Sequence, residues 1–596
     1  MKLRYLSRAL ILPLLLCFCA QISAKDNWLR VRSKNFILVG NAGESEMRKV
    51  AMKLEQFREA LTIIFPKLRI DTSIPTTVII FKTDDAFRPF KPRYKGKISE
   101  QVGGYFVARP EVNYIVFAAE DRGANPYEII FHEYEHFVVH NNLFRLPLWL
   151  DEGLAEFYSS FEISDKDQKA TLGSPVSRHV YYLRNNTILP LKTLLAVDHK
   201  SPYYNESSKV GVFYAESWAL VHYLILGNDQ KRQSQLTKFI DLIQNDVPTE
   251  EGFHQAFQTD YKTIDDELRP YLNRSLYPVV NVTFKRQLVA ERDLQVSPAS
   301  DAEVEYYSGD LLLNMNRLEE AEAHFKKSIS LDATFAPSRV SFGVLRLRQG
   351  KVSDAKEILE AAVNLDSKSY LAHYFYADAL SADNQIEEAI KHYQESIALN
   401  PNAGFVYLNL GYAYLRRGQE AEAIDVMGKG IGVDPRNPYF YRTLSYMFLQ
   451  RAQGQVAVYN AGNYLKIRGW LDDHSQYMVL VKYFGLRQLE RKAEAARLLD
   501  EAVTRIDTSV WPSPVIQYLR HALTIEGLLA QSTDNDKLTE AHAYAGLELA
   551  QNGDRASALE HLRWVKENGN KNFVEYPLAL AEIARIEGAP AGSPKN

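Results

Sequence analysis

Cysteine is almost absent from this sequence of 596 residues, with Cys17 and Cys19 as its only two. Both lie in the apolar run "ALILPLLLCFCA", which follows three basic residues and precedes the small residues of "QISA". This order predicts a secretory signal peptide over residues 1–24, with cleavage after Ala24. The mature chain would then contain no cysteine, which excludes a disulfide framework, a thiolate metal site and a cysteine nucleophile.

Long hydrophobic runs are also scarce. The signal run is short for a membrane span and contains Pro13, which argues against the alternative of an uncleaved anchor. Neither cysteine follows the small residue that a lipid anchor needs, and no other apolar stretch is long enough to span a bilayer. We therefore expect an exported protein without a stable membrane span, in the periplasm of a Gram-negative bacterium.

Strong charge of either sign is missing as well. The net charge is −4 at pH 7, and removal of the signal takes away three positive charges and no acids, which leaves −7. Without a basic patch, nucleic acid is not an expected partner. The hydrophobic content of 46% is typical of globular protein, and the length requires several domains.

Residues 25–275 carry mixed helix and strand patterns and are expected to form an α+β domain. The short apolar runs at 35–40 and 76–82 predict strands, the helical periodicity of 46–65 predicts a helix, and 103–119 predicts a hairpin. Further helices are expected to about residue 275. Residues 276–300 are less regular and are expected to link this domain to the rest of the chain.

From about residue 301 the chain repeats with a period of 34 residues. Small and large apolar residues recur together at this spacing, at Gly309, Gly343, Ala377 and Gly411, at Ala321, Ala355, Ala389 and Ala423, and at Phe325, Leu359, Tyr393 and Met427. Small residues let two helices of a pair approach closely, and large ones fill the seam with the next pair. Residues 301–590 resemble tetratricopeptide repeats. The resemblance implies an all-α superhelix whose concave face binds a peptide or partner protein.

Two histidines with helical spacing lie in "NPYEIIFHEYEHFVVH". Asn125 is a suitable N-cap, Pro126 suits the first turn, and a helix is expected over 126–140. His132 and His136 then lie one turn apart on one face, where both rings can bind one zinc ion. Glu133 is placed to act as the general base toward a water that the zinc activates.

A third zinc ligand must come from elsewhere. His140 lies about 12 Å along the helix axis from His132, which is too far for all three rings to meet one ion. The acids of "LWLDEGLAEFY" lie on a second helix that starts near Leu148, after the helix-breaking "RLP". Glu152 and Glu156 share one face of this helix, so a carboxylate folded back on the histidines can complete the set.

With this second helix, "HEYEH…PLWLDEGLAEFY" resembles the gluzincin zinc peptidases, most of all their peptidase MA-like branch. The resemblance covers about residues 30–270 and implies that Glu152, which precedes glycine, is the third ligand. It also makes Asp151 and Glu156 candidates for orienting the ligating histidines. "VFYAESWALVHYLILG" matches a second block of the family pattern.

Several further residues are open to two interpretations. Tyr214 in the second block is a candidate for stabilising the negative charge on a carbonyl oxygen, or a core aromatic residue. His179 is expected on the surface. The hairpin strand around "VNYIVF" is expected either to bind extended substrate or to be an ordinary sheet edge. The strand motif by which aminopeptidases of this class hold a free amine is absent, which favours an endopeptidase.

The sequence thus favours an exported zinc metallopeptidase, with one zinc per chain on His132, His136 and Glu152. Its repeats would recruit a protein or peptide substrate, or a partner protein. The alternative from another class is a non-catalytic envelope scaffold that acts through its repeats. A hydrolase of peptidoglycan or another amide is a smaller alternative, because zinc-assisted attack by water does not dictate a peptide.

Overall fold

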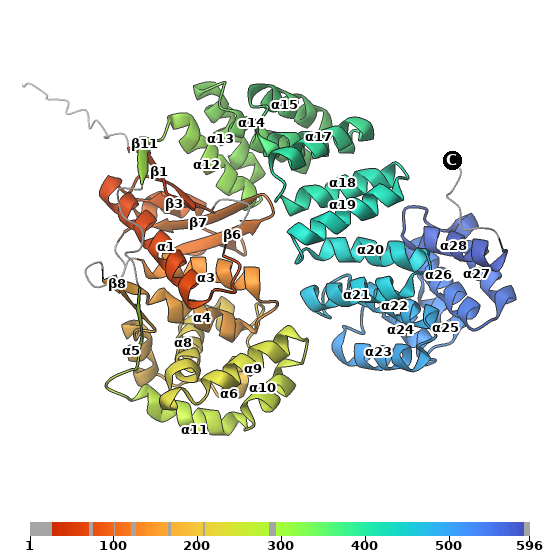
Figure 1. The fold of residues 1–596 in the computed structure, drawn as a ribbon, viewed down its shortest axis with the longest axis horizontal. Helices are drawn as coiled ribbons and strands as arrows, with labels where there is room; N and C mark the ends of the chain where they lie inside the picture. The colour runs from red at the N-terminus through yellow and green to blue at the C-terminus, as the bar shows by residue number, and fades with distance from the viewer. Residues whose placement is uncertain are drawn as a thin grey trace, which may run out of the picture.

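The chain folds into a mixed α+β region followed by a curved array of helix pairs (Figure 1). The structure is a computed structural model, and it describes residues 27–70, 76–100, 102–120, 127–164, 168–206, 209–284 and 294–588. The signal peptide at 1–24 and the N-cap at Asn125 lie outside these residues and stay predictions.

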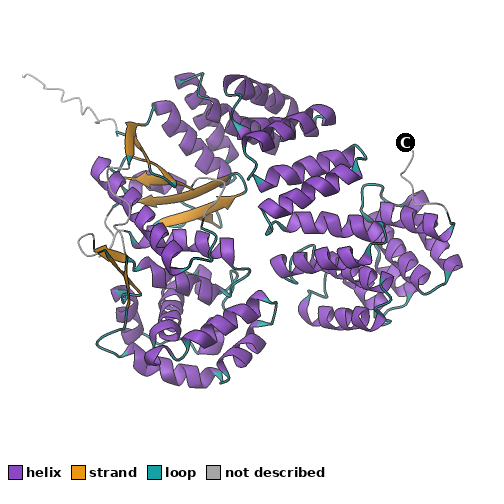
Figure 2. Ribbon diagram, viewed as in Figure 1, coloured by secondary structure: helices purple, strands orange, loops and turns teal. Residues whose placement is uncertain are grey.

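Strands of the α+β region form a six-stranded sheet in the order β11-β1-β2-β3-β7-β6. Strands β2, β3 and β7 run parallel, and the outer pairings are antiparallel. The hairpin β4-β5 and a three-stranded sheet β10-β9-β8 accompany it (Figure 2). The strands are β1 Leu29–Arg32, β2 Phe36–Gly40, β3 Thr76–Phe81, β4 Arg93–Tyr94, β5 Lys97–Ile98, β6 Gly104–Arg109, β7 Val112–Ala118, β8 Glu162–Ser164, β9 Lys169–Leu172, β10 Val280–Thr283 and β11 Gln295–Pro298.

Eleven α-helices of the described chain belong to the α+β region. They are α1 Glu44–Ile64, α2 Asp84–Phe87, α3 Glu128–Asn142, α4 Leu148–Ser159, α5 Ser177–Asn185, α6 Leu191–Leu195, α7 Pro202–Asn205, α8 Val210–Leu226, α9 Gln233–Gln244, α10 Thr249–Phe257 and α11 Tyr261–Leu272. The strands, the hairpin and the helices expected before residue 160 are all present. Strands β8 and β9 had no clear pattern in the sequence, because each is only three or four residues long.

The two faces of the large sheet are covered by different parts of the chain. Val78 and Ile80 of β3 point into a core formed with α1, α3 and α4. Ile79 and Phe81, which alternate with them, pack against the first repeat helices. Central parallel strands are therefore apolar on both faces, as their continuous hydrophobic runs predict. The first repeat helices therefore pack directly on one face of the sheet.

The expected linker at 276–300 is corrected by the structure. Its first half contains β10, which pairs with β9, and its second half contains β11, which pairs with β1 at the edge of the large sheet. The residues of "VVNVTF" and "LQVSPA" can pair with an existing sheet edge. Where the structure describes this segment, strand pairing therefore fixes its path.

The repeat array begins at Asp301 and consists of helices packed in antiparallel pairs. Its helices are α12 Asp301–Asn314, α13 Leu318–Leu331, α14 Ala336–Arg348, α15 Val352–Leu365, α16 Tyr370–Ala382, α17 Ile386–Leu399, α18 Gly404–Arg416, α19 Glu420–Val433, α20 Pro438–Gln450, α21 Gly454–Arg468, α22 Ser475–Gln488, α23 Lys492–Arg505, α24 Ser513–Leu519, α25 Ile525–Gln531, α26 Asn535–Gln551, α27 Arg555–Asn568 and α28 Glu575–Ile586.

The packing confirms the meaning of the 34-residue period. A Cβ atom at Gly343 would lie 2.3 Å from Leu359 Cγ, and one at Gly411 would lie 2.6 Å from Met427 Cε. The large residue thus fills the space left by the glycine of its own helix pair. Phe325 also reaches the next pair, with its ring centroid 6.4 Å from that of Phe342.

The repeat array touches the α+β region a second time, at the loop that joins α3 to α4. Arg436 donates to the carbonyl of Leu143 over 2.6 Å, and Arg145 donates to the carbonyl of Lys466 over 2.8 Å. Asp246, after α9, accepts from Trp470 Nε1 at 2.6 Å and pairs with Arg505. The array therefore holds the α+β region at two separate places.

None of the helices in the described part of the chain combines the length and the apolar character that a membrane crossing requires.

Candidate metal centre

Helices α3 and α4 carry the expected ligands and are held against α8. Helix α3 ends at Asn142, and Pro147 is the N-cap of α4, as the helix-breaking "RLP" predicts. A Cβ atom at Gly153 would lie 2.5 Å from the carbonyl oxygen of Ser217. Only glycine allows α4 to approach α8 this closely, which explains physically why glycine follows Glu152.

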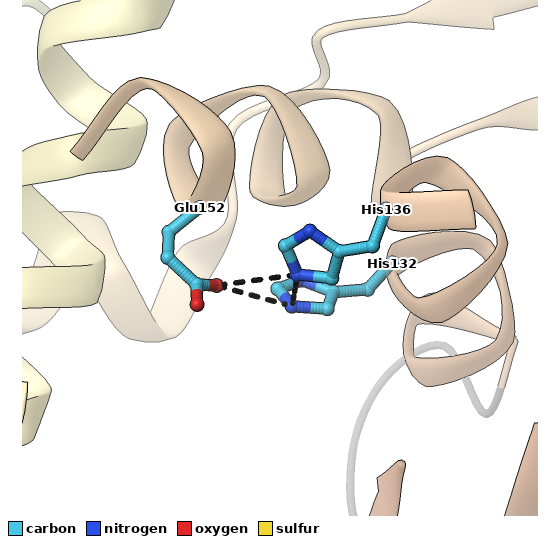
Figure 3. A group of neighbouring side chains, drawn as sticks. All are labelled: His132, His136 and Glu152. Atoms are coloured by element: carbon cyan, nitrogen blue, oxygen red, sulfur yellow. Dashed lines mark hydrogen bonds and ion pairs between the residues drawn. The ribbon is translucent and has the colours of Figure 1, made fainter. Parts of the chain in front are cut away.

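The three expected ligands converge on one point (Figure 3). His132 Nε2 and His136 Nε2 lie 3.1 Å apart. Glu152 Oε2 lies 3.4 Å from each of these nitrogens. Zinc bonds of about 2.0–2.1 Å at tetrahedral angles separate neighbouring donor atoms by about 3.3 Å. The spacing of the three atoms therefore fits one such ion.

Glu152 Oε2 gives a second indication that the site fits a cation. The side chain is 3% exposed, and this oxygen is buried without a hydrogen bond. A buried carboxylate oxygen without a donor is costly unless a cation compensates it. Two ring nitrogens and one carboxylate oxygen are the donor set of thermolysin-type zinc sites.

Neighbouring acids hold the two histidines in place. Asp151 Oδ1 lies 3.2 Å from His136 Nδ1, so it can accept a hydrogen bond from the nitrogen that faces away from the ligand atoms. Glu156 Oε1 lies 3.7 Å from His132 Nδ1. The positions of Asp151 and Glu156 thus agree with an orienting role, which fixes the tautomer and ring direction of a metal-binding histidine.

Glu156 is itself held by α5, and this corrects the expectation for His179. His179 is 7% exposed, not on the surface, and its Nε2 donates to Glu156 Oε2 over 2.9 Å. Arg178 donates to the same oxygen over 3.1 Å and also pairs with Glu128 on α3. Residues 178 and 179 were missed as parts of the site because their sequence neighbourhood contains no motif.

The charges of the cluster shift its pKa values strongly. Burial raises the pKa of Glu152, but the neighbouring His132 and His136 outweigh it and lower this pKa to about 2. Burial lowers the pKa of His136, but Asp151 and Glu152 raise it well above its usual value. For Glu133 burial dominates and raises the pKa. Glu133 therefore holds a proton more strongly than an ordinary glutamate, whereas the expected ligand Glu152 stays ionised and attracts a cation.

Two tyrosines reach the other oxygen of Glu152. Tyr214 on α8 donates to Glu152 Oε1 over 3.4 Å, and Tyr204 on α7 donates to the same oxygen over 3.3 Å. Tyr214 is thus at the centre, as one of its two interpretations requires. Tyr204 was not found from the sequence, since α7 is a four-residue helix without a helical pattern of its own.

Two other histidines lie outside the point where the three ligand atoms meet. His140 is exposed, and its Nε2 lies 2.9 Å from Asp151 Oδ2. With His136 and Asp151 it forms a second, neighbouring group of possible ligand atoms. His222 is buried further along α8, where it bonds to Tyr271 and the carbonyl of Gly173.

The expected substrate strand needs one correction. The "VNYIVF" strand is β7, which lies between β3 and β6, so the edge strand at this end of the sheet is β6. Helix α3 lies against this edge, where a Cβ atom at Gly104 would come within 2.5 Å of Ile129 Cγ2.

Comparisons with protein-family models separate the two halves of the chain. A model described as TPR repeat matches residues 377–418, and one described as tetratricopeptide repeat matches 306–335 and 406–437. A model described as a protein of unknown function, DUF1570, matches residues 129–250, which include α4, α8 and most of α3. The C-terminal half thus contains tetratricopeptide repeats, which generally bind partner proteins or peptides.

No curated protein matches the chain. Similar solved structures include pilF of Pseudomonas aeruginosa (17% identity, 37% of this chain and 97% of that chain, TM-score 0.33). They also include YrrB, a TPR protein with an unusual peptide-binding site (14%, 33%, 98% and 0.28). A third is a tetratricopeptide repeat protein from Parabacteroides merdae (13%, 48%, 100% and 0.30). Likenesses of this size carry no functional inference.

Proposed function

We propose that the α+β region is a zinc-dependent hydrolase of the gluzincin type, acting on peptide bonds within a chain. One observation carries this proposal: three ligand atoms from α3 and α4 lie 3.1 and 3.4 Å from one another, and one of them is a buried oxygen without a hydrogen bond. A purely structural zinc site would be closed by a fourth protein ligand, and the described residues offer only three around this point.

His132, His136 and Glu152 would hold the ion. Zinc, when bound with an open position, acts as a Lewis acid that polarises a carbonyl and makes water more acidic. Asp151 favours the tautomer of His136 whose Nε2 lone pair points to the ion, and Glu156, 3.7 Å from His132 Nδ1, is near enough to favour the same tautomer of His132 by its charge. Arg178 and His179 in turn fix Glu156, so α5 supports the site from behind.

Glu133 is the proposed general base. It is the residue after His132 on α3, it is half-buried, and its charge influences both His132 and Tyr214. Its raised pKa suits a group that takes a proton from water and then passes it to the leaving amine. To act as the general base, Glu133 needs access to the reacting water and no hydrogen-bond partner from the protein.

Tyr204 and Tyr214 supply the remaining polar groups. Each hydroxyl lies within 3.4 Å of Glu152 Oε1, on the far side of the carboxylate from the histidines. Such a hydroxyl can orient the ligating carboxylate, or turn to donate to an oxyanion as charge develops on it. The edge of β6 beside α3 would bind an extended peptide by main-chain hydrogen bonds.

Metal analysis of the full chain tests the proposal. We expect about one zinc per chain in the wild type and a marked loss in Glu152→Gln, which keeps the shape but removes the charge. Glu162→Gln on β8, an exposed glutamate of the same region, is the matched control and should keep its zinc. Absence of zinc from the wild type after reconstitution would overturn the proposal.

A scaffold in the cell envelope is the second candidate function. The family comparisons support this alternative better than hydrolysis, because they identify the repeats and assign no activity to residues 129–250. On this interpretation the metal centre would be structural or degenerate, and partners would bind the repeats. Export to the periplasm belongs to both candidates and rests on the signal sequence alone.

A further inference from the structure

A pocket of about 550 Å³ lies within the repeat array, far along the chain from the metal centre. Its floor is α20, and α18, α22, α26 and α28 form its walls. The array curves back on itself here, and Arg585 of α28 donates to the carbonyl of Gln450 at the end of α20 over 2.6 Å. A volume of this size is typical of ligand pockets.

Two buried glutamates line this pocket. Glu540 is 5% exposed and Glu575 is 2% exposed. Trp511 Nε1 donates to Glu540 Oε2 over 2.6 Å, and Tyr477 donates to Glu540 Oε1 over 3.3 Å. Tyr544 donates to Glu575 Oε1 over 2.7 Å. Neutral donors hold both carboxyl groups, and within the described residues neither forms an ion pair with a lysine, arginine or histidine.

The pocket lining also contains Arg442 and His474, and within the described residues neither pairs with Glu540 or Glu575. Glu420, a third acid of the lining, pairs with Arg451 at 2.8 Å and so is already compensated. The guanidinium of Arg442 lies 5.1 Å from the centre of the Tyr439 ring, a contact that leaves its charge in place. When both are ionised, Glu540 and Glu575 outweigh this one arginine, so the pocket still favours a positive charge.

The pKa values of the two acids agree with this charge balance. Burial, and then the negative charge of Glu575, raise the pKa of Glu540 to about 8. Burial raises the pKa of Glu575 as well. A cation placed between the two carboxyl groups would lower both pKa values. Binding of a cation and ionisation of Glu540 and Glu575 therefore favour each other.

Aromatic side chains complete the lining. Tyr412, Tyr446, Tyr477 and Phe573 all line the pocket. Aromatic faces attract a desolvated ammonium or guanidinium group and also accept the aliphatic stem that carries it. The polar side chains of Thr443, Gln450 and Asn572 at the same pocket can bond to a peptide main chain.

We propose that this pocket binds a basic side chain of a peptide segment from a partner protein, with Glu540 and Glu575 as its counter-charges. The pocket is larger than one basic side chain requires, so it also accommodates the neighbouring residues of the peptide. This site is independent of the metal centre and of the proposed hydrolase activity. On this proposal, the last repeats select a partner by its charge, and the regular first repeats do not.

Calorimetric titration of the full chain with short blocked peptides tests the proposal. The probe is Ala-Ala-Lys-Ala-Ala, acetylated and amidated, and its matched control has norleucine in place of lysine. We expect the lysine peptide to bind at least about tenfold more tightly than the norleucine peptide, because the norleucine side chain brings no charge into the pocket. Equal binding of the two, or no binding of the lysine peptide, overturns the proposal.

Variants localise the effect. Glu540→Gln and Glu575→Gln keep the shape of the side chains, and each should weaken the lysine peptide by about tenfold or more. Glu494→Gln, a surface glutamate paired with Arg491, should leave the affinity unchanged. Unaltered affinity in both pocket variants would overturn the proposal. Equally tight binding of free butylamine would show that the pocket takes small amines and not peptides, which also overturns it.

Discussion

The α+β region and the repeat array bury polar side chains in different ways. In the array, small neutral residues recur at the period of 34, as at Ser328, Ala362, Ser396 and Gly430, and the two serines donate to main-chain carbonyls. In the α+β region, charged side chains of α3, α4 and α5 converge on one point. Neutral groups can be satisfied locally and repeated, whereas converging charges need a specific counter-charge.

The last repeats depart from this rule and resemble the α+β region. Glu540, Glu575 and the buried pair Arg487–Glu548 all lie in the part where the sequence period is weakest. The regular repeats bury charged side chains as well, such as Asp310 and Arg346, whereas the last repeats place two buried acids on one pocket. We therefore locate chemistry or selection at the metal centre and at the end of the array, with the regular repeats as the frame between them.

The largest expected effect is on catalysis. Glu133→Gln should lower peptide hydrolysis by about 10²–10⁴-fold, because it removes the proposed general base. Zinc content should not change, since Glu133 is not among the three proposed ligands. Turnover of a quenched fluorescent peptide mixture and metal analysis of the same sample give the two readouts.

Glu135→Gln is the matched control, two residues further along α3 and buried at 3% exposure. It should retain both zinc and turnover. Hydrolysis that persists in Glu133→Gln would remove the proposed mechanism and leave the two halves of the molecule alike in lacking catalysis.

One buried group in each region, His222 on α8 and Glu540 on α26, should change the stability with pH in opposite directions. Burial lowers the pKa of His222 to about 4 from an ordinary 6.5. Between these values the unfolded chain binds more protons, so this stabilisation is complete above pH 6.5 and is lost as the pH falls toward 4. A difference of about 2.5 units corresponds to about 3 kcal/mol.

In the array the raised pKa of Glu540, about 8 against an ordinary 4.5, has the reverse sign. Its stabilisation is complete below pH 4.5 and is lost as the pH rises through 8. Urea unfolding from pH 4 to pH 8 measures both. The two windows overlap between pH 4.5 and 6.5, where the opposite slopes offset each other. Relative to the wild type, His222→Gln should lose only the contribution that rises between pH 4 and 6.5, and Glu540→Gln only the contribution that falls between pH 4.5 and 8. The same pH-dependent difference from the wild type in both variants would contradict the assignment.

A third prediction concerns the glycines of the array. Gly343→Ala should lower the free energy of unfolding by about 1–3 kcal/mol, because the new methyl group would overlap the Leu359 side chain. Gly428→Ala, in a helix position with open space around it, should raise stability by about 1 kcal/mol. Chemical denaturation measures both, and equal signs for the two variants would contradict the packing.

The smallest expected effect tests how the two halves are joined. Asp246→Ala removes the acceptor shared by Arg145, Trp470 and Arg505 and should cost about 1–2 kcal/mol. Thermal unfolding should then separate into two transitions, because this contact joins the array to the region that carries α3 and α4. Asp241→Ala, an exposed aspartate on α9, should keep the wild-type profile. A single unchanged transition in both variants would contradict the coupling.

The sequence by itself determined what depends on spacing within one element. His132 and His136 share a face because a helix turns once in about 3.6 residues, and the 34-residue period fixed the repeats in the same way. The resemblance to gluzincins added Glu152, and Gly153 then proved necessary for the contact of α4 with α8.

Tertiary structure alone decided which separate elements meet. Tyr204, Arg178 and His179 reach the centre from α5 and α7, which carry no motif. The second face of the sheet is covered by repeat helices, and the pocket at Glu540 and Glu575 exists only because α28 returns to α20. Periodicity is a local property of the backbone, whereas these contacts depend on loop paths and on burial of apolar surface over long sequence distances.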